Sequence, residues 1–553
     1  MTADETADDT TADAVVARRN RDASRMAAFT AVSRATGFAR VVVVAAVLGT
    51  SYLGNTYQSA NTIPNILFEL FAAGVLQSVL VPIMVEAVDH TSHRDAEHTA
   101  GVVLGAMLSM LAAVVAAGMV AGPWIMRLLV SGVDDAAVAA AEVRLGTFLL
   151  WFFLPQILFY AANLVSTAVL NAIGRFSLPA FAPTVNNVVV IGSYLVFAAM
   201  RQGRPPTLNL TMAEKLVLAL GTTLGVVAFC AVPVIGAWRS GYRIVPRFEF
   251  RHPTLRRLAR QGLWAAGFLA FTQVLLVVVL YLANGVEGGV VVYQLAFMLF
   301  MLPNSLFAVP VFTTAFPALT RFAGARQWGG FGDEVARAAR SITMFTIVSA
   351  GALAALSVPL SELVALGNAS GRSAEVAGAI AGFALGLPGF SVVLFLTRVS
   401  YSYANTRTPT LVNVVVAVVG AVTMGLLVAV APDTDRVTVI GIGYGIAQTV
   451  GALLLGLAVR SRLQEEGARA RHVALPVARI IGATVLASVA VYAVVRVVGP
   501  TGIAAAAVAV AIGGAVVGSL ALCLSWLAGG SAPLVALRTL GGDPGRLVDR
   551  VAA

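Results

Sequence analysis

Three charged side chains lie inside the first two long apolar stretches of the chain: Arg34, Arg40 and Glu69. A charge inside a bilayer is costly unless it faces a watery cavity or a partner, so such residues usually mark a transport or binding path. Arginine stays charged, and its planar guanidinium donates paired hydrogen bonds to phosphate groups. We therefore interpret Arg34 and Arg40 as candidates for anion binding in a membrane-embedded cavity, with Glu69 as their countercharge when the cavity is empty.

The spacing of these residues decides whether they can face one cavity. Arg34 and Arg40 are six positions apart, about 600° of helical rotation, so an unbroken helix directs them differently. Gly37 lies between them and allows a bend that brings both together. Pro64 is predicted to break the second helix before Glu69. The competing interpretation is structural: either arginine reaches the membrane surface through its long side chain, and Glu69 forms an ion pair with no transport role.

Other polar side chains in the apolar stretches are expected to line the same cavity or to form interhelical hydrogen bonds. They are Asn55, Gln58 and Asn61, and further along Asn163, Asn186, Asn187, Gln273 and Gln294. The five histidines fall in predicted loops, and the two cysteines, Cys230 and Cys523, cannot build a disulfide framework or a metal site. No catalytic motif is present, so the sequence predicts neither a catalytic residue nor a cofactor.

The composition indicates an all-α polytopic membrane protein. Of the 553 residues, 58% are hydrophobic and 12% are charged, whereas a soluble domain carries about 25% charged residues. Segments such as 503–527 are apolar over the roughly 20 residues that a membrane-spanning helix needs. The composition therefore excludes a soluble enzyme with a water-facing shell. The net charge of +10 does not indicate nucleic-acid binding, because the basic residues lie in short connections between apolar segments.

Apolar segments separated by charged or Pro/Gly-rich breaks predict about fourteen helices. Their ranges are 28–49, 58–88, 99–128, 141–170, 181–200, 215–238, 258–283, 288–316, 340–360, 373–401, 409–431, 437–459, 476–498 and 502–528. The predicted organisation is a disordered tail (1–27), an N-lobe of six helices (28–238), a basic linker (239–257), a C-lobe of six helices (258–459), a loop (460–475), two further helices (476–528) and a second tail (529–553). Two six-helix lobes are a frequent transporter plan.

Basic residues set the predicted orientation. The connection after the sixth helix holds seven arginines between positions 239 and 260, on the same side as the N-terminal arginines. Because such residues stay in the cytoplasm, both termini are predicted to be cytoplasmic, with the protein in the cell membrane. One connection disagrees, since Arg201, Arg204 and Lys215 fall on the predicted outer side.

Several motifs, in order, resemble the MurJ/MviN lipid II flippases of the multidrug, oligosaccharidyl-lipid and polysaccharide exporter superfamily. The most specific is LNAIGRFSLPAFAPT at 170–184, which is similar to the family's loop between helices four and five. The shorter motifs are SRATGFAR at 33–40, IPN at 63–65, AAG at 72–74, VPI at 81–83, MLP at 301–303, FPAL at 316–319 and TRTPT at 406–410. The resemblance covers about residues 28–530, and the composition is closest to actinobacterial members.

The resemblance implies two lobes around a cationic cavity that opens alternately to either side, with Arg34 and Arg40 matching cavity arginines. The implied cargo is lipid II, the undecaprenyl-pyrophosphate-linked peptidoglycan precursor, and the last two helices supply a groove for its tail. The chain also departs from the family's Gram-negative members. Asn55 replaces an acid, Phe68 and Glu69 replace a basic pair, Ala73 replaces a glutamate, and Phe297 and Met298 replace an Asp–Arg pair.

The sequence-based hypothesis is a lipid II flippase, a transporter and not an enzyme, driven by the membrane potential or an ion gradient. Three alternatives stay open: a polysaccharide or multidrug exporter, a membrane phosphoglycosyl transferase, and a non-transporting scaffold for cell-wall enzymes. The transferase would need Asp clusters to hold magnesium, which the sequence does not show. The expected partners are lipid II, membrane lipids and proteins of cell-wall synthesis or division, without nucleic acid. A monomer is expected, because the predicted cavity lies within one chain.

Overall fold

The chain folds into two helical units. The computed structural model describes residues 3–70, 74–90, 92–467, 474–498 and 502–527, and the elements in these ranges are all helices. Unit 1 comprises residues 1–291 and 366–369, and unit 2 comprises residues 292–365 and 370–553. The all-α prediction is therefore confirmed.

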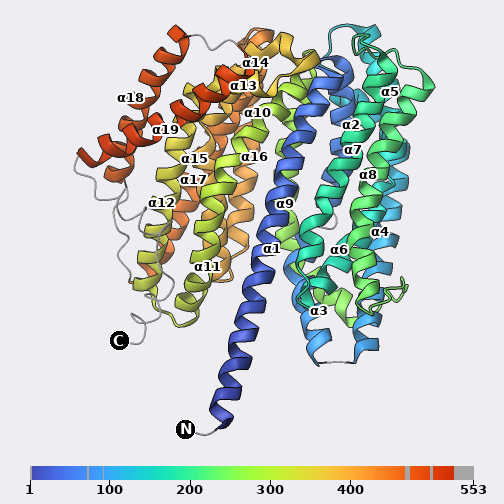
Figure 1. Cartoon of the computed structure of the whole chain (residues 1–553), viewed down its shortest axis with the longest axis vertical. Helices are drawn as coiled ribbons and strands as arrows, with labels where there is room; N and C mark the ends of the chain where they lie inside the picture. Colours follow the sequence, from blue (N-terminus) through green and yellow to red (C-terminus); the bar gives the residue numbers. More distant parts are fainter. Residues whose placement is uncertain (1–2, 71–73, 91, 468–473, 499–501, 528–553) are drawn as a thin grey trace. The chain divides into compact units, whose positions relative to one another are not determined.

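Unit 1 contains the first nine long helices (Figure 1). They are α1 (Ala3–Leu48), α2 (Tyr52–Phe68), α3 (Gly74–His90), α4 (His93–Leu129), α5 (Ala136–Phe153), α6 (Gln156–Ala172), α7 (Ser177–Arg201), α8 (Met212–Arg239) and α9 (Pro253–Asn284). Helix α7 packs between α1 and α8, α2 packs on α5, and α9 packs on α3 and α4. This packing brings α1, α2, α7 and α8, which carry the polar residues described below, into one bundle.

Helix α9 belongs to unit 1, although the sequence assigns its range, 258–283, to the C-lobe. Its last residue, Asn284, is fully buried, and its side-chain nitrogen donates to the Ser59 hydroxyl oxygen on α2 at 2.9 Å. A buried polar pair of this kind fixes the two helices against each other, because separating them would break the hydrogen bond inside the protein, where water cannot replace it.

Helix α1 differs from the prediction at two points. It begins at Ala3, so the segment predicted as a disordered tail, 1–27, is helical from residue 3 onward. The segment contains many alanines, and alanine has the highest helix propensity. The helix also continues through Gly37 without interruption, which corrects the expectation of a break there. A Cβ at Gly37 would lie 3.5 Å from Nδ2 of Asn187, so this glycine lies where α1 packs on α7.

Helix α2 passes through Pro64, which corrects the prediction that this residue breaks the helix. The helix ends four residues later, at Phe68, with Glu69 as its C-cap. Residues 71–73, which include the predicted position Ala73, lie outside the described residues. The predicted second span, 58–88, therefore corresponds to α2 and α3 together.

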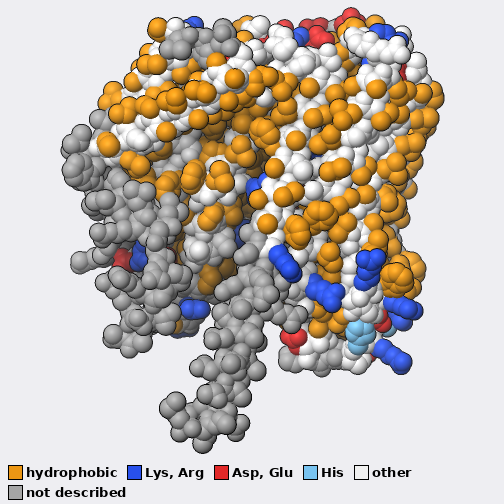
Figure 2. All heavy atoms as spheres, viewed as in Figure 1, with side chains coloured by type: hydrophobic (Ala, Val, Ile, Leu, Met, Phe, Trp, Pro, Cys, Tyr) orange, Lys and Arg blue, Asp and Glu red, His pale blue; other side chains and the backbone are white. Residues whose placement is uncertain are grey.

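The basic segment after α8 lies along the start of α4. The backbone N–H of Arg247 donates to the Gly101 carbonyl at 2.9 Å. A Cβ at Gly105 would collide with the backbone of Arg247, so glycine at this position permits the close approach. In Figure 2, Lys, Arg and His side chains gather at this end of unit 1, whereas hydrophobic side chains cover the middle of its visible face. The predicted linker is therefore a docked segment.

Unit 2 continues from within α10 (Gly289–Pro303) to α19 (Ile503–Leu527). Between them lie η2 (Asn304–Ala308), α11 (Val309–Gly324), α12 (Trp328–Ala355), α13 (Ser357–Val364), η3 (Gly367–Arg372), α14 (Ser373–Ala384), α15 (Leu387–Ser402), α16 (Arg407–Val430), η4 (Asp433–Asp435), α17 (Arg436–Glu465) and α18 (Ala474–Val498). Its core includes Phe312, Phe331, Phe395 and Leu455 from α11, α12, α15 and α17. Helices α18 and α19 cover α12 and α13 (Figure 1).

Twelve helical segments in the described part of the chain are long and apolar enough to cross a membrane, or thirteen if the bent pair 367–384 and 387–402 is one span. Helices α2 and α3, of 17 residues each, are not among them. Many large apolar side chains are exposed, among them Leu426 on α16, Leu453 on α17 and Ile512 on α19. Exposed apolar helices of this length need a lipid environment, so the chain is a multi-pass membrane protein.

The connection that disagreed with the predicted orientation contains a buried ion pair. Arg201 is 8% exposed and Glu214 is 2% exposed, and the arginine Nη1 lies 3.3 Å from the carboxylate Oε1. A guanidinium paired inside the protein is neutralised there, whereas the positive-inside rule concerns basic residues in the loops that flank the spans. Arg201 therefore carries no information about orientation.

Candidate functional site

Arg40 lies at a polar junction of three helices in unit 1. In the amide orientation that satisfies both neighbours, the Asn186 side-chain oxygen accepts from Arg40 Nη1 at 3.2 Å, and its nitrogen donates to the Gly225 carbonyl at 3.2 Å. A Cβ at Gly225 would lie 2.6 Å from the Asn186 side chain, so glycine lets α8 approach α7 here. Helices α7 and α8 therefore hold the amide that positions the α1 guanidinium.

Three tyrosines lie within electrostatic range of this guanidinium. Arg40 interacts electrostatically with Tyr57 of α2, Tyr160 of α6 and Tyr194 of α7. The Tyr57 hydroxyl lies 2.8 Å from that of Tyr194 and 2.5 Å from that of Thr222 on α8. Five helices thus contribute to one polar cluster, which we call the Arg40 cluster: Arg40, Tyr57, Tyr160, Asn186, Tyr194 and Thr222.

The two predicted arginines differ in environment. Arg40 is half-buried and belongs to the Arg40 cluster, whereas Arg34 is exposed and has no hydrogen bond or ion pair within the described ranges. Since α1 is continuous between them, their rotation about the helix axis directs them differently. The structure therefore does not bring Arg34 into the contacts that hold Arg40.

Glu69 is half-buried at the end of α2. Within the described part of the chain, its carboxylate forms no ion pair with Arg34 or Arg40. The proposed role as their countercharge thus has no contact in this conformation to support it.

The three predicted polar residues on α2 divide by burial. Asn55 is fully buried; its Nδ2 donates to the Val286 carbonyl at 2.8 Å, and its Oδ1 accepts from the Val290 N–H at 2.9 Å. Both of its polar ends are thereby used to hold the start of α10. Gln58 is also buried, and Asn61 is half-buried.

Other predicted polar residues hold helices together. Nδ2 of Asn187 donates to the Thr36 hydroxyl at 3.1 Å, which joins α7 to α1. Asn163 on α6 accepts from Thr167 at 3.3 Å, and its side chain also interacts with the Cys230 thiol on α8.

Two positions that the sequence analysis singled out, Phe68 and Phe297, contain aromatic packing. The Phe68 ring lies 5.2 Å from that of Tyr160 in unit 1. In unit 2, the Phe297 ring lies 5.3 Å from that of Phe300 and 5.9 Å from that of Phe383. Because stacked and edge-to-face rings fill this space, the interior of unit 2 around Phe297 is apolar.

Sequence reasoning missed two features of unit 1. The tyrosines of the Arg40 cluster gave no signal, because tyrosine is also the residue expected where a helix crosses the membrane–water interface. Glu142 of α5 is fully buried, and its Oε1 lies 2.8 Å from the Thr56 hydroxyl on α2. Glu142 could have been found from the sequence, because it is the only acidic residue in the two apolar helices α5 and α6.

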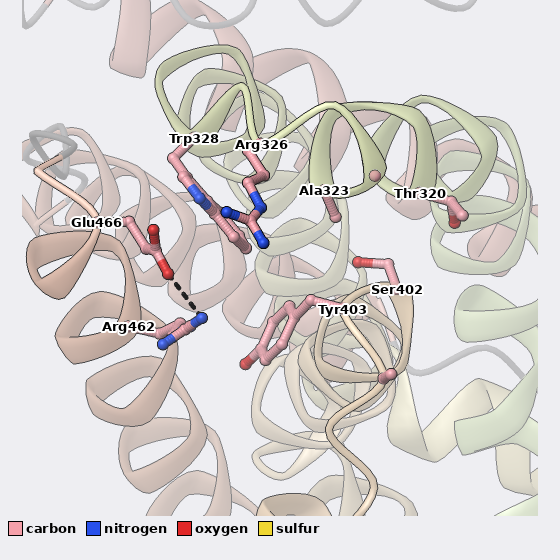
Figure 3. A pocket seen from close by; sticks show the side chains of 10 residues that line it. Thr320, Ala323, Arg326, Trp328, Ser402, Tyr403, Arg462 and Glu466 are labelled. Atoms are coloured by element: carbon pink, nitrogen blue, oxygen red, sulfur yellow. Dashed lines mark ion pairs between the residues drawn. The ribbon is translucent and has the colours of Figure 1, made fainter.

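Unit 2 has a pocket of about 510 Å³ where α11, α15 and α17 end (Figure 3). Arg326 lies beside Trp328, and Tyr403 faces Arg462. Arg462 is already neutralised, because it pairs with Glu466 at 2.6 Å and Glu465 at 3.3 Å. Burial raises the pKa of the Tyr403 phenol, so its hydroxyl is neutral. The pocket contains none of the sequence-predicted site residues.

Solved structures of two membrane transporters share this fold. A solved structure described as lipid II flippase MurJ in an inward closed conformation matches with a TM-score of 0.67 and 19% identity, and the match covers 89% of this chain and 98% of that one. An inward-facing multidrug resistance MATE family transporter matches with a TM-score of 0.63 and 15% identity, over 79% and 95% of the two chains. At these sequence identities, the structural similarity establishes the fold only.

Sequence comparison identifies the family. A family model described as lipid II flippase MurJ matches residues 44–512, so the chain belongs to the MurJ family. It is 26% identical over 466 residues to the probable lipid II flippase MurJ of Rhizobium tropici, covering 83% of this chain and 84% of the relative. It is 26% identical over 449 residues to the lipid II flippase MurJ of Burkholderia cenocepacia, covering 78% and 82%.

Proposed function

We propose that this protein translocates lipid II, the undecaprenyl-pyrophosphate-linked peptidoglycan precursor, between membrane leaflets by alternating access. Family membership supports the cargo, because the curated relatives carry the name lipid II flippase MurJ. The observation that carries the proposal is Arg40. It is a half-buried guanidinium in a membrane-spanning helix, held by Asn186 and within electrostatic range of three tyrosines.

This geometry suits a diphosphate. Only Nη1 of Arg40 is engaged with Asn186, so the guanidinium keeps further N–H donors for phosphate oxygens. The hydroxyls of Tyr57, Tyr194 and Thr222 donate to one another and to the Leu218 carbonyl, which leaves the Tyr160 hydroxyl as a further uncharged donor. A site of this kind binds an anion strongly enough for recognition and weakly enough for release.

Translocation makes and breaks no bond, so we propose a transporter without catalytic residues or a cofactor. Arg34 and Glu69 retain a proposed role as residues that meet the cargo in another conformation of the cycle. Gln58 and Asn61, on the same helix as Tyr57, are proposed as part of the same path. Asn55 is proposed as a positioning residue only, because both of its polar ends are already bonded.

The test is depletion of the protein followed by measurement of lipid II accessible at the outer surface, with variants supplied in trans. We expect Arg40→Ala to lower the outer pool at least tenfold and Arg40→Lys to restore it in part, because lysine keeps the charge but loses the planar fork. Arg144→Ala, at an exposed arginine of α5, is the matched control and should behave as the wild type. An unchanged outer pool in depleted cells that have no second transporter would refute the proposal.

We further propose that the protein lies in the cell membrane with both termini in the cytoplasm. The arginine-rich end of unit 1 supports this orientation, and the buried Arg201–Glu214 pair leaves only Arg204 and Lys215 in the connection that opposed it. In intact cells, a membrane-impermeant thiol reagent should label Asp134→Cys and should reach Arg243→Cys only after permeabilisation. The reverse pattern would overturn the orientation. We also propose a monomer, because the Arg40 cluster is built within one chain.

A further inference from the structure

A second charged group in unit 1 is fully enclosed by protein. Glu142 lies in the second turn of α5, within a candidate membrane span, and its side chain is 0% exposed. It takes no part in the Arg40 cluster. A buried carboxyl in a membrane-spanning helix is costly to keep unless it has a partner or a function.

The contacts of Glu142 are few. Its Oε1 lies 2.8 Å from the Thr56 hydroxyl oxygen, and its Oε2 is buried without a hydrogen-bond partner. The Thr56 hydroxyl oxygen also lies 2.8 Å from the Tyr52 backbone carbonyl, one turn earlier in α2. The carboxyl is therefore joined to α2 through a single hydroxyl group.

Counting protons decides how these contacts are made. A threonine hydroxyl has one proton and two lone pairs, and a backbone carbonyl can only accept. If Thr56 donates to the Tyr52 carbonyl, its 2.8 Å contact with Glu142 is a hydrogen bond only when the carboxyl carries a proton and donates it to Thr56. If the carboxyl is ionised, Thr56 must turn its proton to Glu142, and the Tyr52 carbonyl loses that bond.

The surroundings favour the protonated arrangement. An ionised Glu142 would place a buried charge on an oxygen that no donor satisfies, which costs several kcal/mol. The charged and titratable groups on α5 and on the helices packed against it are Tyr52, Tyr57, His93, Arg94, Asp95, Glu97, His98, Arg127, Arg144, Tyr160, Glu214, Lys215, Cys230 and Arg239. Within the described residues, none of these side chains forms a hydrogen bond or an ion pair with Glu142. Arg127 and Arg144, the nearest arginines along α4 and α5, are exposed.

We propose that Glu142 is a proton-binding site of this protein. In this conformation it holds a proton and donates it to Thr56. When α2 and α5 separate enough to admit water, the proton passes to a water molecule, and the Thr56 hydroxyl turns from the Tyr52 carbonyl to the new carboxylate. The position of α2, which also carries Tyr57 of the Arg40 cluster, thereby depends on proton uptake. This last step rests on the proposed function and makes the proton the coupling ion for cargo movement.

The proton site can be tested without cargo, on the purified full-length protein in lipid nanodiscs. Infrared spectra separate a protonated carboxyl from a carboxylate. We expect the wild type at pH 7 to show a protonated-carboxyl band that Glu142→Gln lacks and that the control Glu69→Gln keeps. Thr56→Val should shift this band, because the carboxyl loses its acceptor. Identical spectra for the wild type and Glu142→Gln, or an unshifted band in Thr56→Val if the glutamine variant does not fold, would overturn the proposal.

Coupling is tested with the outer lipid II pool in depleted cells that carry the variants. We expect collapse of the proton gradient to lower the pool several-fold in the wild type. Glu142→Gln, which is fixed in the neutral form, should show little response to the gradient. A wild type that flips lipid II regardless of the proton gradient would overturn the coupling step alone. A wild type that flips no lipid II would overturn the proposed function, and the infrared result would still decide whether Glu142 binds a proton.

Discussion

Replacement of Asn55 by alanine is expected to destabilise unit 1 without acting on the cargo site. The variant removes the acceptor for the Val290 N–H, one of the free donors at the start of α10. It also removes one of two donors to the Val286 carbonyl. That carbonyl still accepts a hydrogen bond from the Gly289 N–H, at 3.2 Å. An orphaned buried N–H costs about 1–3 kcal/mol, and a lost neutral hydrogen bond costs about 0.5–1.5 kcal/mol. We therefore expect a total of about 2–4 kcal/mol.

The loss of stability can be measured as the rate at which a thiol reagent labels Cys230. It is buried in α8 of unit 1, whereas Cys523 is exposed, so a Cys523→Ser background leaves one thiol that reacts when unit 1 opens. If labelling follows the opening equilibrium, each 1.4 kcal/mol raises the rate about tenfold. Asn55→Ala should then react at least about 30-fold faster than the parent protein.

The matched control is Asn61→Ala, on the same helix but half-buried, which should change the rate by about twofold or less. If Asn55→Ala labelled at the parent rate and instead lost transport, Asn55 would be a cargo-binding residue, and the reasoning from its two backbone hydrogen bonds would be refuted.

Three further substitutions test the packing of unit 1 by the same labelling assay. Gly105→Ala places a Cβ against the docked backbone of Arg247 and should cost about 1–3 kcal/mol, whereas Gly192→Ala meets open space and should be neutral; equal effects would contradict the docking. Arg201→Gln leaves the Glu214 carboxylate buried without its partner and should cost about 3 kcal/mol, so a neutral result would show that the pair is not buried. Tyr57→Phe removes the hydroxyl contacts with Tyr194 and Thr222 and should lower the stability of unit 1 by about 1–3 kcal/mol. Labelling at the wild-type rate would show that these contacts do not stabilise the unit.

Arg40 was predicted from the sequence as a site residue, but the contacts that hold it were not. Its charge and its place inside an apolar stretch identified it without a structure, because the cost of a charge in lipid depends on depth along one helix. Its partners could not be identified, since Asn186 lies on α7 and Tyr57 on α2. The prediction that a bend at Gly37 joins Arg34 to Arg40 was wrong about the helix, which continues through that residue. The glycine instead lies where α1 packs on α7.

The amino-acid sequence alone determined that the chain is helical, crosses the membrane many times and resembles a flippase family, because the transfer of apolar segments into lipid is a local property of about 20 consecutive residues. Tertiary structure decided which polar residues are bonded and which are available. The Asn55 side chain is held by a backbone group 235 positions away, and α9 joins unit 1 through Asn284. Glu142 is buried where α5 packs on α2, and its only hydrogen bond in the described structure is to the Thr56 hydroxyl. Hydrogen-bond partners so distant in sequence leave no periodic pattern, so only the folded chain reveals them.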